Sequence, residues 1–180
     1  MAIRKRRTSR LLLTDERDRL LLLCGRDPRR AGARWWFTVG GGVEAGEDYV
    51  AAALREIHEE TALEPAGARL GPVVWTRRIL FGVDGRHYDQ YEEYRPVRVT
   101  AAEVSAMRVA TDEGSYGHHW WTVDELSTTS ETVHPTGMGG LLPPVLTGAA
   151  LSRPPVHLGD FDVDEQRGGG PDGAPGVRVT

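Results

Sequence analysis

The stretch GGVEAGEDYVAAALREIHEETAL occupies residues 41–63 and decides the fold. Residues 48–57 within it are rich in good helix formers. Asp48 is a suitable N-cap, because its side chain can accept a hydrogen bond from an amide of the first helical turn. The sequence therefore predicts a helix that begins at Asp48, directly after a turn that contains glycine.

Three glutamates of this helix share one patch of its surface. Glu56, Glu59 and Glu60 are spaced i, i+3 and i+4, which brings their carboxylates together. Like charges at this spacing destabilise a helix by roughly 0.2 to 0.5 kcal/mol per pair unless a cation compensates them. Carboxylate oxygens suit Mg²⁺ or Mn²⁺. For an isolated Glu-x-x-Glu-Glu motif, however, the solvated face of a surface helix is the better interpretation.

Two neighbouring features favour a metal site over a solvated face. Arg55 can pair with Glu47 and hold the acidic cluster in place. The run at residues 40–42 is all glycine, and without a Cβ its backbone can come close to a phosphate or a metal. A glycine run alone is more often a flexible turn, so the inference depends on the combination.

The spacing of these residues resembles the Nudix box, the family pattern GX5EX7REUXEEXGU in which U is aliphatic. Eight of its nine specified positions match. The matching residues are Gly41, Glu47, Arg55, Glu56, Ile57, Glu59, Glu60 and Leu63. The resemblance implies an α/β fold, a Nudix-type α/β/α sandwich with a mixed β-sheet.

The resemblance also implies roles for individual residues. The implied catalytic set is Glu47, Arg55, Glu56, Glu59 and Glu60, in which the last three are metal ligands and the first two orient them. The carbonyl of Gly40 is a further implied ligand of Mg²⁺ or Mn²⁺. Gly41 and Gly42 are implied substrate contacts.

Ala62 is the one departure from the family pattern, which has glycine there. The position falls where the helix ends and where glycine would supply a left-handed C-cap. Alanine either costs roughly 1 kcal/mol at such a position or the helix ends in another way.

The remaining sequence predicts two hairpins. Apolar runs at 11–13 and 20–24 flank a charged turn, as in a hairpin whose strands are buried on both faces. Segments 73–81 and 87–99 are rich in β-formers and flank an Asp-Gly pair, which is typical of a tight turn.

Further along the chain, we expect a strand at 120–122, followed by a helix start at 124–126. A terminal helix is expected over 138–151. Pro143 and Pro144 must kink or split it.

These elements fit one domain with a tail on each side. With 180 residues, of which 39% are hydrophobic, the chain can bury the core of a single domain. We assign residues 1–8 to a basic N-terminal tail and residues 9–151 to the domain. Residues 152–180 are rich in glycine and proline and are interpreted as a C-terminal tail. The tail could lie across a neighbouring subunit, so a homodimer stays open.

Charge and composition exclude several classes of protein. A net charge of −4 argues against general binding to nucleic-acid polymers, although a small anionic substrate can still be held by a metal and local arginines. Cys24 is the single cysteine, so no intrachain disulfide forms, which suits the cytoplasm. No apolar segment is long enough for a secretory signal or a membrane span.

The sequence says less about the substrate pocket. Trp36 could stack on a nucleobase, but an aromatic residue in a strand is more often part of the core. Side chains alternate along a strand, so only one of Glu92 and Glu93 can face the box helix, as an extra metal ligand or general base. His118 and His119 are adjacent and diverge in direction, which disfavours a zinc site.

The resemblance implies a metal-dependent pyrophosphohydrolase, in which water attacks phosphorus. Its substrate would be a nucleoside triphosphate or a nucleoside diphosphate linked to another group. Glu60 and Glu56 are the first candidates for the general base, followed by Glu92 or Glu93. The alternative is a domain of the same fold that binds a nucleotide metabolite without cleaving it.

Overall fold

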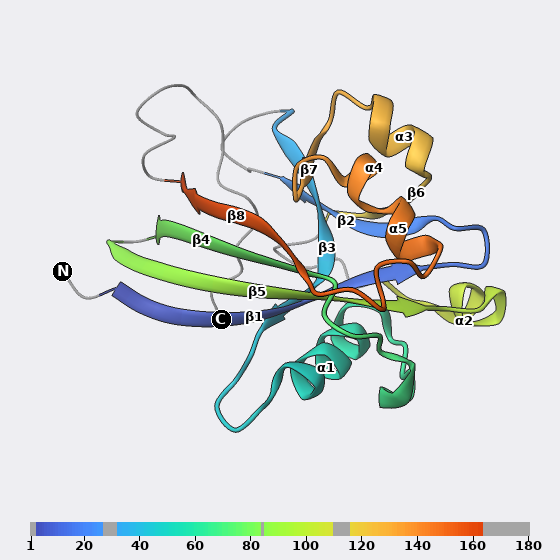
Figure 1. Ribbon diagram of the computed structural model, residues 1–180, viewed down its shortest axis with the longest axis horizontal. Helices are drawn as coiled ribbons and strands as arrows, with labels where there is room; N and C mark the ends of the chain where they lie inside the picture. The colour runs from blue at the N-terminus through green and yellow to red at the C-terminus, as the bar shows by residue number, and fades with distance from the viewer. Residues whose placement is uncertain (1–2, 27–31, 84, 110–115, 164–180) are drawn as a thin grey trace.

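The computed structural model describes residues 3–26, 32–83, 85–109 and 116–163. Eight strands form one mixed sheet with the order β6-β2-β3-β1-β5-β4-β8, and β7 pairs with β3 (Figure 1). The strands are β1 (Ile3–Thr14), β2 (Leu20–Arg26), β3 (Arg34–Gly42), β4 (Trp75–Val83), β5 (Arg86–Arg98), β6 (His118–Trp121), β7 (Thr132–His134) and β8 (Val156–Asp162). The helices are α1 (Tyr49–Thr61), η1 (Gly67–Arg69), α2 (Ala101–Ala106), α3 (Val123–Thr128), α4 (Met138–Leu141) and α5 (Pro143–Leu146).

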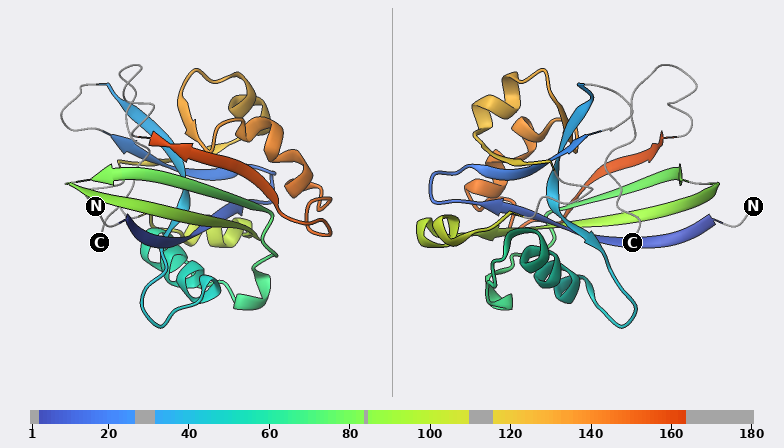
Figure 2. Two further views of the ribbon diagram at one scale, coloured as in Figure 1. Left: turned by 60° about the vertical axis from the view of Figure 1, so that its left-hand side comes forward. Right: turned by 180° about the vertical axis from the view of Figure 1, so that it is seen from behind.

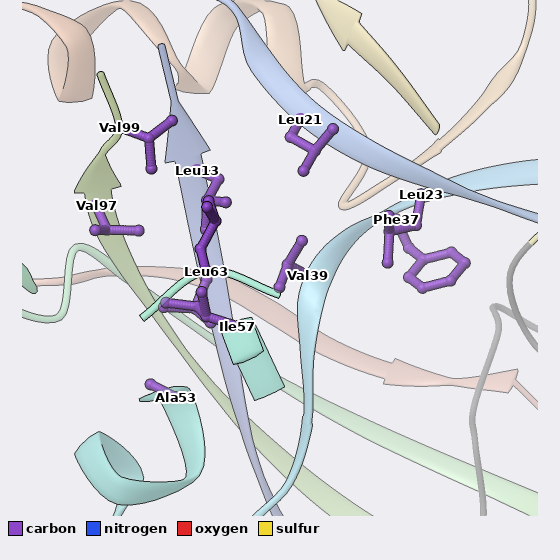
Figure 3. Close-up of a cluster of buried hydrophobic side chains, with 11 residues drawn as sticks. Leu13, Leu21, Leu23, Phe37, Val39, Ala53, Ile57, Leu63, Val97 and Val99 are labelled. Carbon is purple, nitrogen blue, oxygen red and sulfur yellow. The ribbon is translucent and has the colours of Figure 1, made fainter. Parts of the chain in front are cut away.

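Helices cover both faces of this sheet, as Figure 2 shows. On one face, Leu13 of β1 packs with Ala53 and Ile57 of α1 (Figure 3), in a cluster that also includes Leu11. On the other face, Leu12 packs in the cluster that includes residues of α3, α4 and α5. Successive leucines of β1 point to opposite faces of the sheet and thus contribute to two apolar layers. The predicted α/β sandwich with a mixed sheet is confirmed.

The predicted first hairpin is replaced by a different pairing. Strands β1 and β2 pair only at Thr14 and Leu20, and β3 runs between them in the sheet. The leucines of both runs are nevertheless buried, as expected for strands covered on both faces. The predicted β4–β5 hairpin does form, with antiparallel pairs from Trp75↔Tyr94 to Val83↔Arg86.

The basic N-terminal segment belongs to a central strand and is not a tail. β1 begins at Ile3 and runs parallel to β5 as far as Thr14, with β3 on its other side. Thr8 and Arg10 are buried. Arg4, Lys5 and Arg7 are exposed, as a basic tail would be, but their backbone lies in the sheet.

The predicted C-terminal tail also contains a strand. β8 pairs in parallel with β4, and the Val156 amide donates to the Val74 carbonyl at 2.9 Å. Val163 is buried in a small cluster with Ile79, Phe81 and Tyr88. The boundary predicted at residue 151 therefore falls too early, because the few apolar residues that follow it are enough for one edge strand. Residues 164–180 lie outside the described ranges.

Removal of β8 is expected to destabilise the domain. A chain that ends at Leu151 should have a free energy of unfolding at least about 2 kcal/mol below that of a chain that ends at Val163, because apolar contacts and ladder hydrogen bonds are lost. Urea unfolding of the two chains measures the difference. A difference below about 1 kcal/mol, the range of ordinary surface changes, would contradict the packing described for β8.

The late segment follows the sequence pattern closely. Thr122 and Glu125 form a capping box that starts α3. The predicted terminal helix is split into α4 and α5, with Pro143 in the first turn of α5, where its missing N–H costs nothing. No helix in the described ranges is long and apolar enough to cross a membrane.

Candidate active site

Helix α1 carries the predicted acidic cluster and packs on β1 and β3. The Asp48 side chain caps it by accepting a hydrogen bond from the Ala51 amide at 2.8 Å. Ala53 and Ile57 hold the helix to the core (Figure 3). Val50 of the same helix is exposed. The remaining contacts fix the orientation of the helix and hence of its glutamates.

The helix ends at Ala62 in a left-handed conformation. Ala62 has φ 58° and ψ 19°, and its amide donates to the His58 carbonyl at 2.8 Å. The helix thus ends where the family pattern places glycine, with an alanine that must accept an unfavourable backbone conformation.

The variant Ala62→Gly is therefore expected to be more stable than the natural chain by about 0.5 to 1 kcal/mol, because glycine has no Cβ to clash in this conformation. Ala51→Gly is the matched control in an exposed turn of the same helix, and it should lower stability by about the same amount. Urea melts measure both signs. A loss of stability in Ala62→Gly would contradict the left-handed assignment.

Arg55 connects the acidic residues of the box. Its Nε and Nη2 donate to Glu47 at 2.8 and 3.0 Å. Its Nη1 donates to Glu56 at 2.8 Å and to Glu59 at 3.3 Å, and Nη2 also reaches the Gly42 carbonyl at 2.8 Å. The hydrogen bonds from Arg55 lower the pKa of Glu47 to about 2. The structure thus shows the Glu47–Arg55 pair that the sequence suggested.

The glycine run lets two carboxylates approach the end of β3. Glu60 Oε2 accepts a hydrogen bond from the Gly40 amide at 2.8 Å. A Cβ on Gly41 would lie 2.1 Å from Glu56 Oε1, which is far inside contact distance. Gly40 has φ +131°, and a Cβ there would meet the Ser9 carbonyl at 2.2 Å. Side chains at these positions would displace the glutamates or β1.

The Gly40 carbonyl, a predicted metal ligand, already has one partner. It accepts a hydrogen bond from Arg10 Nη1 at 3.0 Å. A carbonyl oxygen has two lone pairs, so one remains for a metal. Its role as a ligand stays a prediction.

The donor set fits a hard divalent cation in kind. Glu47, Glu56 and Glu59 share the single guanidinium of Arg55, so three carboxylates face one positive charge. In the part of the chain that the structure describes, no three acidic, histidine or cysteine side chains already converge as a metal site. Arg55 Nη1 donates to both Glu56 and Glu59.

Two further predicted substrate residues lie on opposite faces of the sheet. Trp36 packs edge-on against Trp121, with ring centroids 5.2 Å apart, and its Nε1 donates to Glu131 at 3.2 Å. These contacts favour core packing over a free stacking platform. Glu93 pairs with Arg95 at 2.7 Å and lies on the α1 face, close enough to Tyr49 to influence its pKa. Of the two candidate acids in β5, Glu93 therefore faces the box helix.

Glu92 points to the other face and is fully buried. It accepts hydrogen bonds from the Tyr94 hydroxyl at 2.6 Å, from Arg77 Nε and Gln90 Nε2 at 2.8 Å each, and from Arg10 Nε at 3.4 Å. Burial alone would raise the pKa of Glu92, but the charges of Arg77 and Arg10 outweigh it and lower the pKa to about 2. These contacts occupy the carboxylate, so Glu92 is unsuited to be a metal ligand or general base.

His134 completes this buried polar cluster. Its burial and the charge of Arg77 lower its pKa to about 4, so the ring is neutral at pH 7. The sequence did not identify the cluster, although its members in β5 alternate with period two. Arg10 and Glu92 are 82 residues apart, and no local pattern indicates that β1 and β5 are neighbours.

The comparisons agree with this architecture. The family model described as NUDIX domain matches residues 4–141. No curated relative matches the sequence.

Several solved structures share the fold. A MutT protein from Methanosarcina mazei Go1 is 16% identical with a TM-score of 0.56, and the match covers 83% of this chain and 97% of that one. A MutT Nudix hydrolase from Burkholderia pseudomallei is 22% identical with a TM-score of 0.53, covering 78% and 98%. An Ap4A hydrolase from C. elegans, solved as a binary complex, is 17% identical with a TM-score of 0.51, covering 81% and 98%.

Proposed function

The chain belongs to the NUDIX-domain family and is a Nudix pyrophosphohydrolase, and we propose that it uses Mg²⁺ or Mn²⁺ to cleave a nucleotide diphosphate bond. The substrate would be a nucleoside triphosphate or a nucleoside diphosphate linked to another group. Nudix hydrolases act on small nucleotide derivatives, which agrees with the acidic net charge of −4.

One observation carries this proposal: the carboxylates of Glu47, Glu56 and Glu59 share the guanidinium of Arg55 beside a strand end made of glycine. Glu56 and Glu59 are both bonded to Arg55 Nη1, and Glu60 lies against Gly40. This arrangement leaves negative charge for a cation and an unobstructed backbone for a phosphate. Glu56 and Glu60 are only 8% and 2% exposed, whereas glutamates on the solvated face of a surface helix are exposed.

Glu56, Glu59 and Glu60 would hold the metal, together with the Gly40 carbonyl. The bound ion would neutralise charge on the diphosphate and lower the pKa of a water molecule. Glu60 or Glu56 would accept the proton as water attacks phosphorus and the bridging P–O bond breaks. Glu93 is the next candidate for this base. Arg55 and Glu47 would keep the glutamates oriented, and Gly41 and Gly42 would admit the phosphate.

A substrate panel tests the proposal. It should contain dNTPs, sugar nucleotides, ADP-ribose and dinucleoside polyphosphates such as Ap4A, each with Mg²⁺, with Mn²⁺ and with EDTA. Mass spectrometry of both products in ¹⁸O-labelled water identifies the bond that breaks and the phosphorus that is attacked. Metal-dependent cleavage of at least one compound is expected. Tight binding without cleavage across the panel would instead indicate a nucleotide sensor.

Two further expectations stay predictions. We propose a cytoplasmic location, which the single cysteine suits, and a homodimer. Sedimentation of the full chain determines the mass of the assembly.

A further inference from the structure

The sheet face opposite α1 holds an arginine without a partner. Arg6 is half-buried in β1, and among the described residues its side chain makes no hydrogen bond or ion pair, while its Nη1 is enclosed. Burial and the neighbouring charge of Arg10 lower its pKa. Burying a guanidinium nitrogen without a hydrogen-bond acceptor is energetically unfavourable. An anion bound beside Arg6 would supply such an acceptor.

Two more polar atoms beside Arg6 lack partners. Gln90, the register partner of Arg6 in β5, is 1% exposed, and its Oε1 accepts no hydrogen bond from the described residues. Its Nε2 donates to Glu92, which fixes the amide so that Oε1 must accept. The Thr8 hydroxyl, two residues beyond Arg6 on the same face, is fully buried and equally unpartnered. The donor Arg6 Nη1, the acceptor Gln90 Oε1 and the hydroxyl of Thr8 thus all lack hydrogen-bond partners among the described residues.

Positive side chains outnumber negative ones around Arg6. Arg6, Arg10 and Arg77 lie on this face with Glu92 as the carboxylate that they influence, and His134 is neutral there at pH 7. The Glu56 carboxylate also acts on Arg6, but it is already paired with Arg55, so three guanidinium groups face Glu92 as the carboxylate that they share. The excess favours a ligand that carries negative charge.

This cluster adjoins the candidate active site through Gly42. Arg55 Nη2 donates to the Gly42 carbonyl at 2.8 Å. The Nη2 of Arg6 lies 3.4 Å from the position that a Cβ on Gly42 would occupy. A substrate whose diphosphate lies at the glycine run can thus reach Arg6 with the group attached to that diphosphate.

We propose that Arg6, Thr8 and Gln90 form a subsite for a phosphorylated sugar, so that the preferred substrates carry a phosphate monoester besides the diphosphate that is cleaved. This subsite rests on the proposed function and adds a specificity to it. Arg6 binds the phosphate, and Arg10 and Arg77 contribute positive charge. Gln90 Oε1 is enclosed, so a sugar hydroxyl can donate to it only after the neighbouring side chains move. Nothing in the box itself would distinguish such substrates from those with an unphosphorylated sugar.

Binding in EDTA tests the subsite separately from catalysis. The probes are adenosine 5′-monophosphate and the 2′,5′- and 3′,5′-bisphosphates of adenosine, measured by calorimetry on the full chain. At least one bisphosphate should bind about tenfold or more tightly than the monophosphate, as expected for charge-assisted hydrogen bonds. Because neither a metal nor a scissile diphosphate is present, loss of this preference and loss of hydrolysis are distinct results.

Arg6→Ala should abolish the preference for the bisphosphate, and Arg6→Gln should reduce it if the alanine variant fails to fold. Arg4→Ala, at an exposed position two residues earlier in β1, is the matched control and should keep it. Thr8→Val should reduce it in part. Equal affinities for monophosphate and bisphosphates in the natural chain would overturn the proposal. So would equal losses in the Arg4 and Arg6 variants, which would indicate only a diffuse effect of charge.

Discussion

The variants Glu59→Gln and Glu60→Gln are each expected to lower kcat by at least ~100-fold, the range typical of lost acid/base or metal-binding groups. Glutamine keeps the length of the side chain and an oxygen that can accept the Gly40 amide hydrogen bond, so the fold should persist. It removes the negative charge that a divalent cation requires. Steady-state kinetics on the best substrate of the panel, at saturating Mg²⁺, measures the effect.

Glu64→Gln is the control for this pair. Glu64 follows the same helix, but its side chain is 79% exposed and its described partner is His58. Its kcat should stay within about threefold of the natural value, as for an ordinary surface change. Unchanged melting temperatures would show that the losses at positions 59 and 60 arise in the site. Full activity in either variant would rule out the proposed metal ligands.

The variant Glu92→Ala is expected to lose about 3 to 5 kcal/mol of stability, because it leaves Arg10 and Arg77 as uncompensated buried charges. Urea unfolding measures the loss. Asp89→Ala is the matched control on the same strand. Asp89 also pairs with an arginine of β4, Arg78, but the Arg78 side chain is 42% exposed. Asp89→Ala should therefore lower the free energy of unfolding by about 1 kcal/mol or less. Equal losses would mean that burial of the cluster is unimportant.

The pH dependence of this contribution has a definite sign. The folded pKa of Glu92 is lowered to about 2, below the value of roughly 4.3 expected in the unfolded chain. The unfolded state therefore binds the proton more readily, and the stabilisation is present above about pH 4.3 and is lost as the pH falls towards 2. Glu92→Gln removes this dependence from the acid limb of the stability curve. An identical acid limb in both proteins would show that Glu92 does not contribute it.

Local patterns were sufficient to predict the helix and its acidic patch. The capping residue Asp48 and the spacing of Glu56, Glu59 and Glu60 lie within a few turns of one helix, where side-chain geometry follows from the period of 3.6 residues. The end of the helix at Ala62 was also predictable in position. Its conformation was not, because alanine allows two ways to end a helix.

Sheet pairing was the part that the sequence could not determine. Alternation predicts that Glu92 and Glu93 face opposite ways, but it does not say which of them faces α1. That choice depends on β1, which lies beside β5 although the contacting residues Arg10 and Glu92 are 82 positions apart. The same long-range pairing makes the basic N-terminal segment part of the sheet. Composition alone cannot distinguish such a strand from a solvated tail.

The central position of β1 also has a consequence for the order of folding. β1 precedes the other strands along the chain, yet it lies beside β5 in the sheet, and its Leu12 packs in the cluster that includes residues of α3, α4 and α5. During synthesis, the leucine runs at 11–13 and 20–23 therefore stay uncovered until most of the domain has emerged. Such non-local pairing slows folding and prolongs the period in which a nascent chain can aggregate or needs a chaperone.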